Sequence, residues 1–195
     1  MKPNQKNNPS IHHRRSIRLK AYDYSQVGAY FVTICTHEKE CRFGDVVSGE
    51  MVLNELGKIA WNQWECLSER FPNIVMNEFV VMPNHMHGII IINERDNTIP
   101  MVGAGFTPVQ NGVSQYQSGV PLAGTPTVGD IVGAYKSLVF KECLALYKNQ
   151  DRYLGRLWQR NYFERIIRNE KAHQKIVNYI LTNPLKWEED KYYHD

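Results

Sequence analysis

The stretch IVMNEFVVMPNHMHGIIII, at residues 74–92, decides the fold that the sequence predicts. It holds two apolar runs, 74–83 and 85–92, which are rich in valine and isoleucine. Apolar runs of this length that are bounded by turn residues predict buried strands, and Pro83-Asn84 supplies such a boundary. We therefore expect two strands at the centre of a sheet.

Before this stretch the pattern predicts a strand, a hairpin and a helix. Residues 28–37, GAYFVTICTH, combine β-branched and aromatic side chains, as strands do. Two short runs, 42–47 and 51–53, flank Ser48-Gly49-Glu50, which indicates a hairpin turn. Asn54 is an N-cap candidate, because apolar residues repeat at helical spacing after it.

After this stretch the pattern predicts two helices and a short strand. Thr127 and Asp130 are spaced like a capping box at the start of the first helix. Residues 157–167, LWQRNYFERII, predict a short strand with a turn. Asn169 then caps a last helix, which Pro184 ends. This order indicates an α+β fold in which helices pack against an antiparallel sheet.

Length and composition suit one globular domain with extensions. The chain has 195 residues, of which 43% are hydrophobic and 22% are charged. We expect a basic arm at 1–25, a single domain at 26–187 and an acidic tail at 188–195. Residues 94–126 are expected to be a flexible, poorly ordered insertion, because they lack an apolar pattern and almost all charge. No signal peptide or membrane span is evident, so we expect a cytoplasmic protein.

Positive charge is concentrated in two regions, although the net charge is only +3. Residues 1–20 hold lysines and arginines and no acidic residue, and basic residues outnumber acidic ones from 136 to 186. Such regions favour a surface that binds a polyanion. A solubilising face with a disordered basic arm would produce the same pattern.

Two histidines in the second apolar run are candidate metal ligands. His85 and His87 are two residues apart, so a strand would place both imidazoles on one face and Met86 in the core behind them. Two adjacent imidazoles can bind one divalent ion. The alternative is a pair of hydrogen-bonded histidines on a half-buried strand.

Tyr179 and Asn183 are candidates on the last helix. They are four residues apart, so they project from one helix face. The tyrosine hydroxyl could serve as a nucleophile and the amide oxygen as a metal ligand. The alternative is a half-buried tyrosine and an asparagine that caps the helix before Pro184.

Together these residues resemble a known family. The run VVMPNHMHGIIII resembles the HUH motif of single-tyrosine transposases that act on single-stranded DNA, in which two histidines flank a hydrophobic residue. The resemblance is strongest to REP-associated tyrosine transposases, which carry MPNH and a second histidine, then WQR with an aromatic residue, then a YIxxNP helix. Here the three motifs occur in that order as MPNHMH, LWQRNYFERIIRNE and NYILTNP. The resemblance runs from about 28 to 186 and is interrupted only by 94–126.

The resemblance implies a ferredoxin-like fold with His85 and His87 on a central strand. It also implies a metal-dependent enzyme that cleaves and rejoins single-stranded DNA at REP-like hairpins. Tyr179 would attack a phosphodiester to give a 5′-phosphotyrosine and a free 3′-OH. Asn183 would be the third ligand of a divalent ion, Mg²⁺ or Mn²⁺. Whether the protein is a monomer or a homodimer stays open.

Candidate DNA contacts come from both basic regions. In REP-associated tyrosine transposases, which this chain resembles, the N-terminal region helps to recognise a sequence at the foot of a hairpin. Arginines near WQR could bind phosphates, and the aromatic residues among them could stack on bases or belong to the core. The candidates are Arg14, Arg15, Arg18, Arg156, Trp158, Arg160, Arg165 and Arg168.

Two other functions compete with DNA strand transfer. One is a DNA-hairpin-binding protein with weak or no catalysis, although both histidines and the tyrosine are present. The other is a zinc hydrolase that uses the two histidines. We find no convincing third histidine or carboxylate ligand close to them in the sequence, which counts against the hydrolase.

Overall fold

The computed structural model describes residues 23–94 and 126–193. The expected insertion, most of the expected basic arm and the candidates Arg14, Arg15 and Arg18 lie outside these residues. Within the described ranges, none of the helices combines the length and apolar character that crossing a membrane requires.

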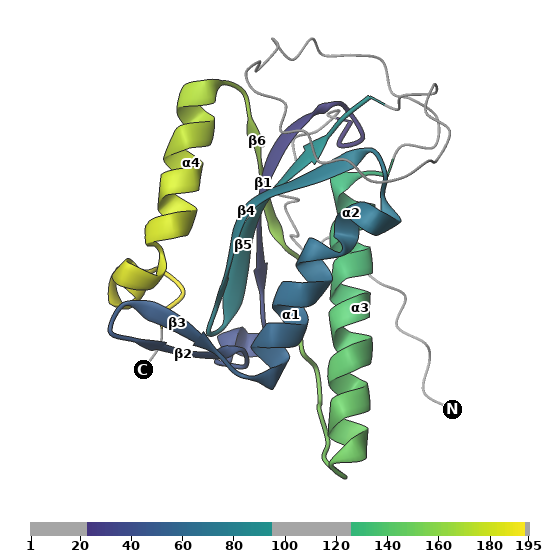
Figure 1. Ribbon diagram of the computed structural model, residues 1–195, viewed down its shortest axis with the longest axis vertical. Coiled ribbons are helices and arrows are strands. Elements are labelled where there is room, and N and C mark those ends of the chain that lie inside the picture. The colour runs from purple at the N-terminus through teal and green to yellow at the C-terminus, as the bar shows by residue number, and fades with distance from the viewer. Residues whose placement is uncertain (1–22, 95–125, 194–195) are drawn as a thin grey trace, which may run out of the picture.

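Four antiparallel strands form the main sheet (Figure 1). They are β1 (Gly28–Cys35), β4 (Ile74–Met82), β5 (His85–Ile92) and β6 (Phe163–Ile167), in the order β4-β5-β1-β6. With helical segments between β1 and β4 and a long helix between β5 and β6, this is the ferredoxin-like arrangement that was expected. The histidine pair lies on β5, an inner strand of the sheet, as predicted. The predicted hairpin is also present, as β2 (Gly44–Val47) and β3 (Glu50–Leu53).

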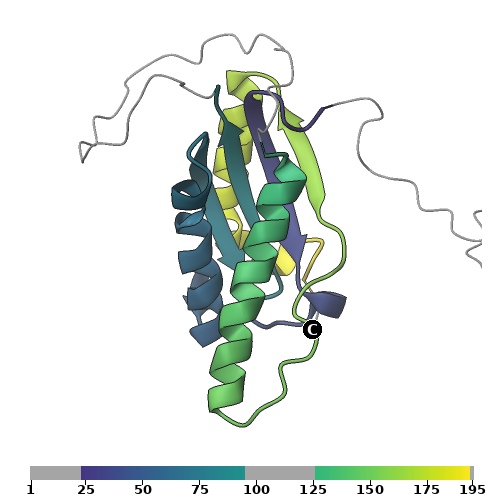
Figure 2. The same cartoon turned by 90° about the vertical axis from the view of Figure 1, so that its right-hand side faces the viewer.

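Helices cover both faces of the sheet (Figures 1 and 2). One face carries α1 (Glu55–Glu65), the short α2 (Leu67–Arg70) and the long α3 (Val128–Asn149). The other face carries α4 (Glu170–Thr182). Two 3₁₀ turns complete the chain: η1 (His37–Lys39) follows β1, and η2 (Pro184–Glu189) follows α4.

The predicted caps begin the three longer helices. The Asn54 side chain accepts from the Gly57 amide at the start of α1, and Asn169 does the same for Ala172 at the start of α4. Thr127 and Asp130 form both hydrogen bonds of a capping box at the start of α3. Because each cap satisfies backbone amides that the helix leaves free, sequence signals alone locate these starts well.

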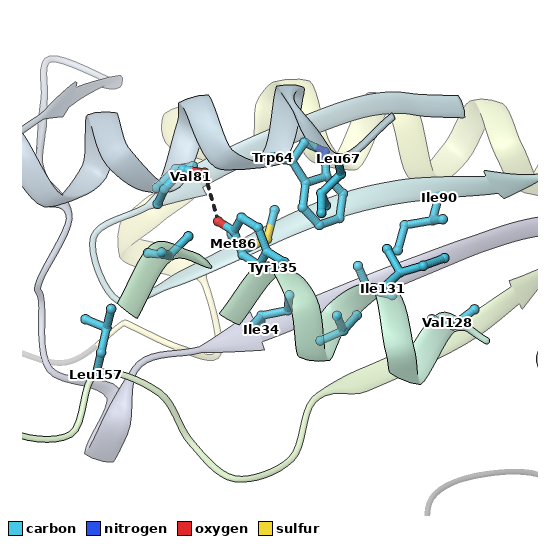
Figure 3. Packing of buried hydrophobic residues seen from close by; sticks show 14 of the residues in the cluster. Ile34, Trp64, Leu67, Val81, Met86, Ile90, Val128, Ile131, Tyr135 and Leu157 are labelled. Carbon is cyan, nitrogen blue, oxygen red and sulfur yellow. Dashed lines mark hydrogen bonds between the residues drawn. The ribbon is translucent and has the colours of Figure 1, made fainter. Parts of the chain in front are cut away.

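Residues of β5 alternate between two apolar clusters. Met86, Ile90 and Ile92 point toward α1 and α3 and pack in the larger cluster (Figure 3). At its centre the rings of Trp64 and Tyr135 meet edge to face, with centroids 5.2 Å apart. The odd-numbered residues of β5 point toward α4, where the smaller cluster lies.

At Gly88, β5 packs closely against the first helical layer. A Cβ atom at this position would lie 2.3 Å from Cζ2 of Trp64, whose side chain is fully buried. The absence of a side chain therefore lets the strand that carries the histidines pack directly against α1.

We predict that Gly88→Ala lowers the free energy of unfolding by about 1–3 kcal/mol, because the core cannot absorb the added methyl group without shifting Trp64. Urea denaturation measures the change. Gly133→Ala is the matched control on α3: its Cβ would meet nothing within 4 Å. Since alanine is the better helix former, it should raise stability by about 0.5–1 kcal/mol. Equal stability of Gly88→Ala and the wild type would contradict the packing argument.

Candidate active site

Two buried imidazoles face each other beneath α4. The exposed fraction is 0% for His85 and 1% for His87, and their Nε2 atoms are 3.1 Å apart. Two nitrogens bound to one ion at about 2.0–2.1 Å are separated by roughly 2.8–3.4 Å, depending on the coordination geometry. The spacing of the pair therefore fits two ligands of a single metal ion.

The other nitrogen of each imidazole is held by a neighbouring polar side chain. Nδ1 of His87 lies 2.8 Å from Oγ1 of Thr33, and Nδ1 of His85 lies 2.8 Å from Oδ1 of Asn84. Asn84 is itself fixed, because its Nδ2 donates to the carbonyl of Tyr192 at 2.7 Å. When both Nδ1 atoms donate to these oxygens, both Nε2 lone pairs are free for a metal.

Burial keeps both imidazoles neutral at physiological pH. It lowers the pKa of His85 to about 4, and the nearby Asp190 carboxylate opposes only part of this effect. Burial also holds the pKa of His87 well below its usual value, with His85 acting in the same direction. Since a metal binds the unprotonated ring, no proton has to be removed before the pair can act as ligands at neutral pH.

Tyr179 reaches this pair from α4. Its Oη lies 3.0 Å from Nε2 of His87 and donates a hydrogen bond to Oδ2 of Asp190 at 3.2 Å. Tyr179 as a whole is 38% exposed. Partial burial raises the pKa of the phenol above its usual value, and Asp190 raises it further. The structure thus brings the tyrosine and the two histidines together.

Asn183 and Asp190 complete the polar cluster. Nδ2 of Asn183 donates to Oδ2 of Asp190 at 2.9 Å, and Oδ1 of Asn183 is buried without a hydrogen-bond partner among the described residues. The other oxygen of Asp190 accepts from the Tyr192 amide at 2.7 Å. A buried acceptor that lacks a donor is costly, and a cation would satisfy it.

Asp190 is the residue that sequence reasoning missed. The search near the histidines found no third histidine or carboxylate, and Asp190 was assigned to an acidic tail. In the structure, ligand atoms of His85, His87 and Asp190 all lie within 4.8 Å of one another, so this group could hold a metal ion. The η2 turn reverses the chain after α4 and returns Asp190 to the tyrosine. The one available signal was Pro184, which marks where the helix must end and the chain can turn.

A cleft of about 530 Å³ opens beside the tyrosine. We call it the tyrosine cleft. Its apolar wall comes from β1, β6 and α4, and its rim carries basic side chains. Its lining includes Phe31, His87, Phe163, Arg165, Lys175, Ile176, Tyr179, Asn183, Lys186, Glu189, Asp190 and Lys191.

The predicted DNA contacts within the described residues are divided between three hollows. Arg165 lines the tyrosine cleft, and both Arg165 and Arg168 line an adjoining hollow of about 390 Å³. Arg156, Trp158 and Arg160 line a third hollow, together with residues of η1. Trp158 is partly committed to the core, because its Nε1 donates to the Lys136 carbonyl and its ring packs on other core aromatics. Its predicted stacking on DNA stays a prediction.

The fold of this protein is already known in solved structures. One of them is the REP-associated tyrosine transposase bound to a REP hairpin, with a TM-score of 0.53 over 90% of this chain and 77% of that chain. At 18% identity, the likeness demonstrates a shared fold. It agrees with the resemblance drawn from the three motifs and confirms the expected architecture.

A protein of Haemophilus influenzae, described as uncharacterised, is 42% identical over 191 residues, which are 97% of this chain and 98% of that protein. The chain therefore belongs to the same family as the Haemophilus protein. No family profile matches the sequence.

We predict that Thr33→Val weakens Mn²⁺ binding at least tenfold, because removing a polar partner of a ligating histidine typically costs roughly 10–100-fold in metal affinity. Valine keeps the shape and removes only the hydroxyl. Titration of Mn²⁺ followed by electron paramagnetic resonance gives the affinity. Thr182→Val is the control, since that hydroxyl donates to the Asn178 carbonyl within α4. Wild-type affinity in Thr33→Val would mean that this contact does not orient the imidazole for an ion.

Proposed function

We propose that this protein cleaves and rejoins single-stranded DNA with Tyr179 as the nucleophile. The observation that carries the proposal is the position of its hydroxyl, 3.0 Å from Nε2 of a neutral, buried His87. A phenol placed against two potential metal ligands, at the edge of a solvent-open cleft, is suited to attack on a phosphate group rather than to structural packing alone.

The proposed cofactor is a divalent ion, Mg²⁺ or Mn²⁺, held by His85, His87 and Asn183. The two neutral nitrogens and the unpartnered amide oxygen suit such an ion, and they leave it with its full charge. When bound, the ion would stabilise negative charge on the phosphate oxygens and on the phenolate.

The proposed chemistry balances without an external energy source. Oη of Tyr179 attacks phosphorus, the bond from phosphorus to the 3′ oxygen breaks, and the products are a 5′-phosphotyrosine and a 3′-OH. The phenolic proton passes to Oδ2 of Asp190, which already accepts the hydroxyl's hydrogen bond, and the leaving 3′ oxygen takes a proton from water. Attack by a 3′-OH on the phosphotyrosine rejoins DNA and restores the phenol. The bond energy is conserved in the covalent intermediate.

The proposed DNA partner is a single strand that carries a hairpin. The basic side chains on the rim of the tyrosine cleft support a polyanionic substrate. The similar structure was solved with a REP hairpin, which supports a substrate of the same kind for this chain.

Hydrolysis by a bound zinc ion is the competing activity, because two histidines and Asp190 are also a suitable zinc ligand set. A hydrolase in which zinc activates water for direct attack would form no covalent bond to its substrate. Covalent capture of DNA therefore separates the two functions.

We predict that Tyr179→Phe abolishes covalent capture of a labelled hairpin strand in Mn²⁺ and leaves hairpin binding within about twofold, since binding rests on charge and stacking. The adduct is measured as a denaturation-resistant band. Tyr162→Phe is the matched control, because Tyr162 packs against the larger cluster on the opposite face of the sheet. If Tyr179→Phe still forms the adduct, the nucleophile is a different residue.

Three further variants assign the roles of the remaining polar residues. We predict that Asn183→Ala lowers Mn²⁺ affinity about tenfold or more, because it removes the unpartnered oxygen, and that His85→Ala with His87→Ala removes measurable binding. Asp190→Asn should leave Mn²⁺ affinity closer to wild type and slow cleavage, because an amide cannot accept the phenolic proton. Calorimetry and single-turnover rates measure the two effects. If Asp190→Asn loses more Mn²⁺ affinity than Asn183→Ala, Asp190 is the third ligand.

A further inference from the structure

Phe163 is an exposed aromatic residue at the meeting point of two hollows. It lies on β6, on the sheet face that carries α4, and its side chain is 39% exposed. Phe163 and Arg165 line both the tyrosine cleft and the adjoining hollow of about 390 Å³. The two hollows therefore adjoin along β6, an edge strand of the sheet.

The charges around Phe163 suit a phosphate backbone. Four exposed cationic side chains line the tyrosine cleft: Arg165, Lys175, Lys186 and Lys191. In the part of the chain that the structure describes, none of them is in a salt bridge. Of the two carboxylates that line the cleft, that of Asp190 is already occupied by hydrogen bonds from Tyr179, Asn183 and Tyr192. The cleft thus presents a net positive rim.

The ring of Phe163 is accessible on the side where these cations lie. The Lys191 ammonium group lies over it, 5.7 Å from its centroid. A lysine side chain in this exposed position is easily displaced, because such a contact contributes only about 0.5–1 kcal/mol. A planar, uncharged group could take its place on the ring while the ammonium group binds a phosphate.

We propose that Phe163 is the stacking platform for an unpaired base next to the scissile phosphate, with Lys175, Lys186 and Arg165 binding the flanking phosphates. An apolar ring surrounded by cations matches the two chemical parts of a nucleotide, a π-face and an anion. The inference deepens the proposed function, because it assigns the single-stranded part of the substrate to the tyrosine cleft. It assigns no base identity, since every base can stack.

The test separates stacking from charge and does not depend on catalysis. Full-length Tyr179→Phe protein without added metal is titrated against two labelled strands of about twelve nucleotides, the upper range for one such site. One strand is oligothymidylate, and the other carries the same phosphates with abasic sugars. Fluorescence anisotropy gives both affinities, and their ratio measures the contribution of the bases.

Adding Phe163→Ala should lower affinity for oligothymidylate about tenfold and leave the abasic strand unchanged. Phe163→Leu should behave in the same way, because it keeps apolar bulk and loses the ring, whereas Phe163→Trp should retain the preference. The double variant Lys175→Gln, Lys186→Gln should weaken the binding of both strands equally. It should also reduce the slope of the logarithm of the binding constant against the logarithm of salt concentration by about 0.7 per lysine. Tyr153→Ala, which removes an aromatic ring that is 92% exposed outside the cleft, is the control and should change neither affinity.

The proposal is wrong if Phe163→Ala and Phe163→Leu lose the same affinity for both strands, or lose affinity for neither. Thermal melts of each variant establish that the protein is folded. Failure of covalent capture by the wild type would count against the strand-transfer mechanism only. The binding measurement uses neither the tyrosine hydroxyl nor a metal, so the two proposals fail independently.

Discussion

The structure depends on β5, whose side chains must pack against helices on both faces of the sheet. Alternate residues of this strand fill the core beneath α1 and α3, and the others face α4. Because side chains alternate strictly along a strand, shifting β5 by one residue would bury Met86 on the α4 face and turn the histidines into the main core. Gly88, held against Trp64, reinforces this register from one side. The apolar packing of the first layer thereby fixes the direction of the imidazoles in the second.

The second constraint is electrostatic. Two imidazoles that are removed from water cannot both carry charge, and their lowered pKa values express this. A neutral pair is held at short range by Thr33 and Asn84, each of which lies within hydrogen-bonding distance of one Nδ1 atom. Oδ1 of Asn183 has no protein donor among the described residues. Neutral nitrogens and an unsatisfied oxygen are donor atoms that suit a cation.

Local signals predicted most of the fold and the first half of the site. The periods around His85 and Tyr179, and the caps at Asn54, Thr127 and Asn169, each depend on residues within a few positions of one another. Asp190 could not be found in this way, because its place depends on the η2 turn and on hydrogen bonds that form only after α4 docks on the sheet. Trp158 shows the same limit. Its sequence context left open whether the ring stacks on DNA or belongs to the core, and in the structure its indole donates to α3 and packs on core aromatics.

The connection between β5 and α3 has a consequence for how this protein can vary. It leaves β5 after Ile92, and at about 3.3 Å per residue this end of the strand is roughly 17 Å from His87. At the other end of this connection, Thr127 and Asp130 form the capping box that begins α3. Both attachment points are therefore fixed by contacts of their own and not by the histidines. An engineered label or a fused domain inserted between them is expected to place little mechanical strain on the histidine pair.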